Sequence, residues 1–130
     1  MSYLKIKMLQ ESSMERLTVL GTGNAMATRC YNTCFTLRSG NDHFLVDGGG
    51  GNGILNRLEA AGIPYTGLRE AFLSHSHTDH IFGLVWIVRH IGPLIRQGLY
   101  DGEFVVHCHR ELAGTCRTLL ELILVPAALH

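Results

Sequence analysis

Four side chains that could carry out chemistry lie within six residues of this chain, in the pattern His-x-His-x-Asp-His. They are His75, His77, Asp79 and His80. Imidazole nitrogens and carboxylate oxygens are ligands that zinc, iron and manganese accept in proteins. The pattern therefore predicts a metal site, and the alternative is a polar loop whose histidines only cap a strand and a helix.

The residues around this motif predict how it is positioned. Residues 69–74 form a short apolar run that is typical of a strand. Side chains two apart in an extended chain point the same way, so His75 and His77 can converge on one ion. Apolar residues then recur at helical intervals, and Thr78 is a candidate N-cap. The last two residues of the motif therefore fall in the first helical turn, where adjacent side chains point in different directions and can serve a neighbouring ion.

The motif resembles the signature of the metallo-β-lactamase fold hydrolases. In that family the first two histidines bind one metal ion, and the aspartate and the last histidine bind a second. The resemblance implies that His75 and His77 serve the first ion, and that Asp79 and His80 serve the second. It also implies that Asp79 is the catalytic residue that orients water, and that two zinc ions are the cofactor, with manganese or iron as alternatives.

A second part of the chain carries the same resemblance. Residues 15–20 alternate and predict a strand, which leads into the glycine-containing residues 21–25. A dinucleotide-binding fingerprint is rejected because its third small position falls on Met26 and no helical pattern follows. The segment LGTGNA is similar to the opening strand and loop of the transfer-RNA 3′-processing (tRNase Z) and arylsulfatase-like branches of the superfamily.

Asp47 is followed by four glycines, at positions 48–51. Consecutive glycines cost backbone entropy, so a neighbouring segment must require the backbone to pass close by. A phosphate-binding loop is one interpretation, but no Lys-Ser/Thr pair follows. The family resemblance implies instead that Asp47 supports the metal centre through its ligands, and a purely structural turn is the alternative.

Alternating and periodic apolar residues predict the other elements, in the order β-β-β-α-β-α-β-α. Further strands are predicted at residues 33–38, 43–46 and 103–106, and helices at residues 52–61 and 111–124. The helix after the motif is predicted to end or kink near Ile91, because Gly92 and Pro93 follow. This order resembles the N-terminal half of an αββα metallo-β-lactamase sandwich, an α/β (α+β) fold with a mixed sheet and flanking helices.

The predicted organisation is an N-terminal extension at residues 1–14 and a partial metallo-β-lactamase domain at residues 15–130. The extension holds an alternating stretch at residues 3–8 that could form a strand, and Met14 is an alternative start. After the motif, the family supplies a third histidine, a bridging aspartate and a last histidine. The later candidates in this chain do not match those positions: His90, Asp101, His107, His109 and His130.

The resemblance therefore implies a metal-dependent hydrolase, present as an N-terminal portion. Its substrate would be a small molecule or a phosphodiester, with water attack on a phosphodiester, a sulfate ester or a related bond. The alternative is a catalytically dead half-domain that acts as a self-associating interaction or binding module. The predicted strands carry apolar residues on both faces, and the chain's own helices can cover only one of them. A bare apolar face is rare on a soluble monomer, so a homo-oligomer is predicted, most simply a two-fold dimer.

Composition limits the partners and the location. The formal net charge is zero and no basic run is present, which argues against nucleic acid without excluding it. No apolar run approaches a membrane span, and Lys5 and Lys7 interrupt the apolar core that a signal peptide needs, so the predicted location is the cytoplasm. The four cysteines lack C-x-x-C spacing and are interpreted as reduced, packed thiols.

Overall fold

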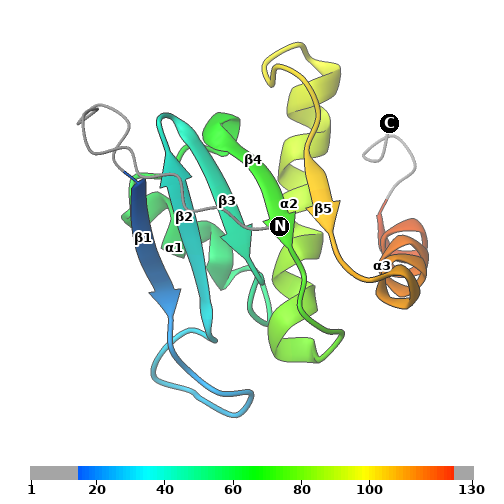
Figure 1. Cartoon of the computed structure of the whole chain (residues 1–130). Coiled ribbons are helices and arrows are strands. Elements are labelled where there is room, and N and C mark those ends of the chain that lie inside the picture. The colour runs from blue at the N-terminus through cyan, green and yellow to red at the C-terminus, as the bar shows by residue number, and fades with distance from the viewer. Residues whose placement is uncertain (1–14, 125–130) are drawn as a thin grey trace, which may run out of the picture.

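The computed structural model describes residues 15–124, which form a mixed five-stranded sheet with flanking helices (Figure 1). The strands are β1 (Glu15–Gly21), β2 (Cys34–Ser39), β3 (Asp42–Val46), β4 (Leu68–Phe72) and β5 (Val105–His107). The helices are α1 (Gly53–Ala60), α2 (Thr78–Arg96) and α3 (Arg110–Ile123), with a short 3-10 turn η2 (Tyr65–Gly67). The predicted element order and the mixed sheet are confirmed; the predictions for residues 1–14 lie outside the described residues.

The order of the strands in the sheet follows their order in the chain. The pairs β1–β2 and β2–β3 are antiparallel, whereas β3–β4 and β4–β5 are parallel. Parallel neighbours need a crossover, and α1 and α2 supply the two crossovers on the same face of the sheet (Figure 1). The ends of β3 and β4 therefore meet at one edge, where Asp47 N donates to Phe72 O at 2.8 Å.

The core lies between the sheet and these two helices. Strand residues with alternate spacing point into it, among them Cys34, Leu45 and Ala71, each no more than 2% exposed. Helix α2 buries apolar residues that recur every three or four positions, which places them on one face: Ile81, Leu84, Ile87 and Ile91. This buried face holds α2, and with it the start of the helix, against the edge of the sheet.

The four glycines after β3 pass directly against α2, as their sequence predicts. Gly48 N donates to His80 O at 2.9 Å, and Gly83 N donates to Gly49 O at 2.8 Å. A Cβ atom at Gly83 would lie 1.8 Å from the carbonyl oxygen of Gly48, so neither backbone leaves room for a side chain. Gly49 has a φ of 73° in the left-handed region, where glycine is favoured.

Two predicted boundaries are wrong. Strand β4 ends at Phe72 and not at Ser74, because Leu73 N still pairs with His107 O but Ser74 N turns to the side chain of Asp47. His75 and His77 therefore lie on a loop. The N-cap of α2 is His77, without a side-chain cap bond, so Thr78 is the first helical residue.

Of the predicted end or kink near Ile91, the end is wrong, because α2 continues through Pro93 to Arg96. Proline removes one backbone hydrogen bond, but Leu94 and Ile95 beyond it pack against the core and offset that loss. The helix ends where Gly98 adopts a φ of 73°, which is typical of a helix C-terminus.

The opposite face of the sheet carries apolar side chains that no helix of the described residues covers (Figure 1). We define this open sheet face by its exposed members: Leu17 (57%), Val19 (54%), Leu37 (43%), Phe72 (41%) and Val105 (36%). Leu17 and Leu37 are direct cross-strand partners. A sheet with apolar residues on both faces is typical of an inner layer.

None of the helices within residues 15–124 is long and apolar enough to cross a membrane. The four cysteines are free thiols, as interpreted from the sequence. Cys34 and Cys116 are buried and Cys108 is partly buried, but Cys30 is exposed, so the packed environment expected for it is wrong.

Candidate functional site

The predicted motif residues gather at the edge of the sheet where β3 and β4 end. The ring centroids of His75 and His77 are 4.5 Å apart, and those of His75 and His80 are 4.0 Å apart. The loop after β4 supplies the first two rings and the first turn of α2 supplies the third. The three imidazoles therefore lie on one side, as the sequence predicts.

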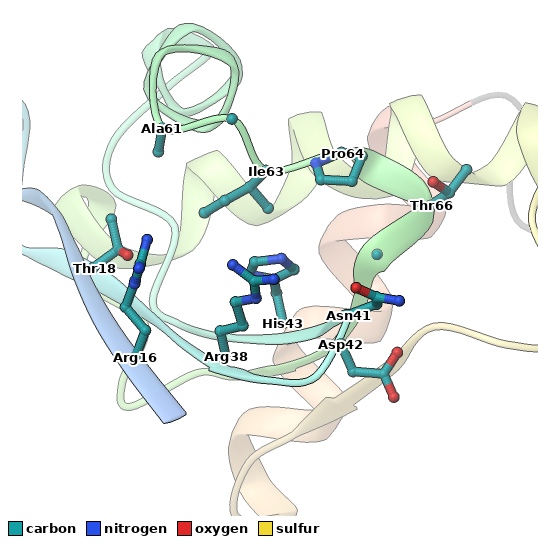
Figure 2. A pocket seen from close by; sticks show the side chains of 12 residues that line it. Arg16, Thr18, Arg38, Asn41, Asp42, His43, Ala61, Ile63, Pro64 and Thr66 are labelled. Atoms are coloured by element: carbon teal, nitrogen blue, oxygen red, sulfur yellow. The ribbon is translucent and has the colours of Figure 1, made fainter. Parts of the chain in front are cut away.

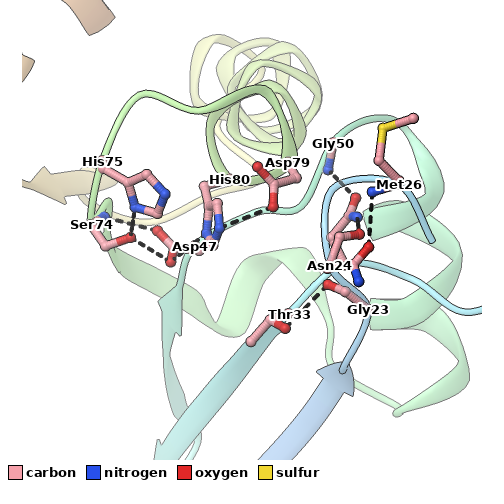
Figure 3. A network of polar contacts seen from close by, with 11 residues as sticks. Gly23, Asn24, Met26, Thr33, Asp47, Gly50, Ser74, His75, Asp79 and His80 are labelled. Atoms are coloured by element: carbon pink, nitrogen blue, oxygen red, sulfur yellow. Dashed lines mark hydrogen bonds and ion pairs between the residues drawn. The ribbon is translucent and has the colours of Figure 1, made fainter.

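Asp79 joins the same cluster (Figure 3). Its Oδ2 atom lies 3.2 Å from Nε2 of His80, and both side chains are mostly buried. Adjacent helical residues leave the axis about 100° apart, which is the reason that the sequence predicts different directions for them. The two side chains still meet at their ends, because the long imidazole reaches back to the carboxylate.

Asp47 lies beneath this cluster and contacts it directly (Figure 3). It is 8% exposed and accepts hydrogen bonds from Ser74 N (2.8 Å) and Ser74 Oγ (2.7 Å). Its Oδ2 atom also lies 2.9 Å from Nδ1 of His80. Ser74 Oγ in turn lies 2.7 Å from Nδ1 of His75, so one carboxylate orients two of the three rings. Asp47 has a φ of 62°, which aspartate tolerates better than most residues.

The loop that follows β1 lies beside the motif, close to the four glycines. Asn32 connects the two loops, because its Oδ1 atom accepts from Gly50 N (3.0 Å) and its Nδ2 atom donates to Asn24 O (2.8 Å). Tyr31 donates its hydroxyl to Gly48 O at 2.6 Å, and burial raises the pKa of Tyr31 to about 12. The tyrosine therefore stays protonated and remains a donor at neutral pH.

Sequence reasoning missed Ser74, Tyr31 and Asn32. Ser74 stands directly before the motif, and its position after an apolar run is the only local signal for it. The other two residues contact the site from more than 15 positions away in the chain, so no local pattern points to them.

The donor types of the motif fit zinc, but the fit is not complete. Within residues 15–124, no group of three or more His, Cys, Asp or Glu side chains is arranged to hold a metal ion. When bonds to a tetrahedral zinc ion are about 2.0 Å long, two of its ligand atoms lie about 3.3 Å apart. The distance of 3.2 Å between Asp79 Oδ2 and His80 Nε2 is close to this value. His80 and His75 also contact protein groups through Nδ1. The fit therefore extends to donor type and to one pair of ligands.

Three further histidines of the described region have structural partners outside the motif. Nε2 of His107 lies 2.7 Å from Oε1 of Glu70, and Nδ1 of His109 accepts from Leu112 N as the N-cap of α3. His90 stacks on Tyr65 with ring centroids 3.8 Å apart. These contacts place the three residues outside the cluster, so the structure gives no support to His107 and His109 as ligands.

Comparisons with known proteins agree with this arrangement. A family model described as Anti-Pycsar protein Apyc1 matches residues 15–91. The chain is 34% identical over 95 residues to ribonuclease Z of Phocaeicola vulgatus, a match that covers 72% of this chain and 29% of that enzyme. In this match and in the two structural matches that follow, the chain spans less than half the length of its relative.

Two solved structures share the fold. The short form of human tRNase Z superposes with a TM-score of 0.66 at 24% identity, covering 84% of this chain and 39% of that one. A metallo-β-lactamase fold protein of Bacillus subtilis superposes with a TM-score of 0.58 at 24% identity, covering 73% and 38%. The described sheet and helices therefore form part of a metallo-β-lactamase fold.

Proposed function

Since this chain belongs to the Anti-Pycsar protein Apyc1 family and has a metallo-β-lactamase fold related to ribonuclease Z, we propose that it is part of a metal-dependent phosphodiester hydrolase. The observation that carries the proposal is the cluster of three imidazoles and one carboxylate at the edge of the sheet.

The proposed roles follow from the contacts. His75, His77, Asp79 and His80 bind zinc together with donors from outside the described residues, with manganese or iron as alternatives. Asp47 orients His80 by accepting its Nδ1–H, which leaves Nε2 on the outer side of the ring. Asp79 also orients the attacking water. The water oxygen would bond to phosphorus while the bond from phosphorus to the leaving ester oxygen breaks, and the proton that the water gives to the Asp79 carboxylate would pass to that leaving oxygen.

The substrate class is proposed from the relatives. Ribonuclease Z by its name acts on RNA, a chain of phosphodiesters, and cyclic nucleotides are small members of the same class. A sulfate ester is the less favoured substrate. The absence of a basic run in the sequence favours a small phosphodiester over a long nucleic acid.

The test compares metal content with hydrolysis. The purified chain is dialysed against zinc, its bound metal is measured by mass spectrometry, and hydrolysis of bis(p-nitrophenyl) phosphate and of a cyclic nucleotide is followed. Hydrolysis that EDTA abolishes and zinc restores is the expected result. Preferential hydrolysis of p-nitrophenyl sulfate would contradict the substrate class, and absence of both zinc and hydrolysis would favour a module without catalysis.

The open sheet face supports a second proposal, which holds under either outcome. Its five exposed apolar residues cross the sheet from β1 to β5, and sheets of this kind pack face to face about 10 Å apart. Because the face is mostly apolar and the carboxylate of Glu70, which lies on it, is paired with His107 at 2.7 Å, we propose that a second copy of this chain covers it, in a two-fold dimer.

Sedimentation tests this assembly. The chain is expected to sediment as a dimer at low micromolar concentration, and Leu37→Asp is expected to shift it to monomer, because a carboxylate at the centre of an apolar interface is left unpaired. Leu122→Asp is the matched control, since Leu122 is an exposed leucine on α3, 80% exposed and away from the sheet. A monomeric wild-type chain that binds no hydrophobic dye would show that the open face needs no cover.

A further inference from the structure

A pocket of about 330 Å³ lies at the start of β3 (Figure 2). The metal-ligand motif follows the end of the parallel strand β4, at the opposite end of the sheet. The pocket lies between the strands near the β2–β3 turn and the loop that follows α1. Residues from both sides line it, including Arg16, Arg38, His43, Ile63, Pro64 and Gly67. The length of β3, five residues or about 16 Å, separates it from Asp47.

Two arginines and one histidine lie side by side on three adjacent strands in this pocket. Arg16 pairs with Arg38 across β1 and β2, and Arg38 pairs with His43 across β2 and β3. Like charges directly opposite each other in a sheet are destabilising. Within the described residues neither arginine has a carboxylate within 4.0 Å, and the one hydrogen bond of the Arg38 side chain there runs from Nε to Gly40 O. The planar ends of both guanidinium groups are left for another partner.

His43 adds a second, independent feature. It is 9% exposed, and its Nδ1 atom has no hydrogen-bond partner among the described residues. A buried polar atom without a partner is destabilising. The backbone of Gly67 lies close to the His43 ring, since a Cβ atom at Gly67 would be 3.3 Å from Cδ2 of that ring. Burial and the nearby Arg38 charge lower the pKa of His43, and the Asp42 carboxylate, which also lines the pocket, offsets them in part.

We propose that this pocket binds a phosphate monoester. Guanidinium groups match phosphate oxygens in a forked, two-point geometry, and two of them on neighbouring strands can share one phosphate. His43 contributes a hydrogen-bonding ring at the buried end. The volume is about ten times that of a water molecule, which leaves room for a substituent such as a sugar beside the phosphate. The site is separate from the motif and does not depend on the proposed hydrolysis.

Binding is tested with inorganic phosphate and adenosine 5′-monophosphate, by calorimetry and thermal unfolding. EDTA is present throughout, so that the motif carries no metal and offers no competing phosphate site. Inorganic phosphate is expected to raise the unfolding temperature, whereas chloride at equal ionic strength is not. Adenosine 5′-monophosphate is expected to bind at least as tightly as inorganic phosphate. Arg38→Met is expected to weaken binding at least tenfold without lowering the unfolding temperature of the free protein, because it relieves the repulsion with Arg16.

Two controls separate this site from others. Arg89→Met removes an exposed arginine of α2 that does not line the pocket, and His77→Ala removes a motif residue; both are expected to keep full phosphate binding. The proposal is overturned if Arg38→Met binds phosphate as the wild type does, or if His77→Ala loses binding. Absence of phosphate binding to the wild type would overturn it as well.

Discussion

Replacing His77 with alanine is expected to lower phosphodiester hydrolysis by more than about 100-fold and to lower bound zinc at the same time. Residues that only orient a metal ligand change affinity or activity by about 10–100-fold, so a direct ligand should change them by more. His77 is exposed, and the described contacts include no hydrogen bond from its ring. The substitution should therefore leave the free energy of unfolding nearly unchanged, and a loss of activity would report chemistry and not misfolding.

A graded series makes this prediction sharp. Asparagine at position 47 tolerates the left-handed backbone and still offers an acceptor to Ser74 N. Asp47→Asn removes the negative charge beside His80, so we expect phosphodiester hydrolysis to fall by about 10–100-fold. His90→Ala changes a histidine that stacks on Tyr65 outside the cluster, and full activity is expected. Equal activity in the wild type and His77→Ala, with equal zinc, would assign hydrolysis to another site.

Replacing Gly83 with alanine is expected to lower the free energy of unfolding by at least about 3 kcal/mol. Its new Cβ atom would lie 1.8 Å from the oxygen of Gly48 and 2.4 Å from the carbonyl carbon, and both belong to backbone that cannot rotate away. Adding a methyl group to a packed core costs about 1–3 kcal/mol when only side chains must move, and here a whole helix must shift. A domain has only about 5–15 kcal/mol in total, so most of its stability is at risk.

Urea unfolding followed by circular dichroism at one protein concentration measures this change. Gly114→Ala is the matched control, because Gly114 lies within α3 and nothing stands within 4 Å of the point that its new Cβ atom would occupy. Alanine in a helix interior is more favourable than glycine by about 1 kcal/mol, so this variant should be more stable than the wild type. If both variants behave alike, the close contact between the glycine segment and α2 does not exist in solution.

Local patterns in the sequence were enough to predict the element order and the position of the motif. Alternation marks β1 to β3, and the helical period marks α2, because each depends on neighbours within a few residues. The His-x-His-x-Asp-His spacing predicts donors between a strand and the start of a helix, and the structure has them on the loop after β4 and in the first turn of α2. The four glycines likewise predicted a close backbone contact, without showing that α2 makes it.

Local spacing could not predict where strands and helices stop when a distant group decides it. Strand β4 ends early because Asp47, 27 positions before Ser74, captures the backbone N–H of that serine. Helix α2 continues past Pro93 because Leu94 and Ile95 reach the core. In both cases the energy of a long-range contact exceeds a local preference, and the sequence contains the preference alone.

The sequence by itself determined which donors this chain holds and that they follow one strand, since residue type and short-range spacing are read directly from it. The tertiary structure alone decided which groups support them and which residues share the second pocket. Arg16, Arg38 and His43 are scattered through the first third of the chain, and only the pairing register of three strands sets them side by side. Register depends on which faces are buried and on how the turns close, and these are properties of the assembled sheet.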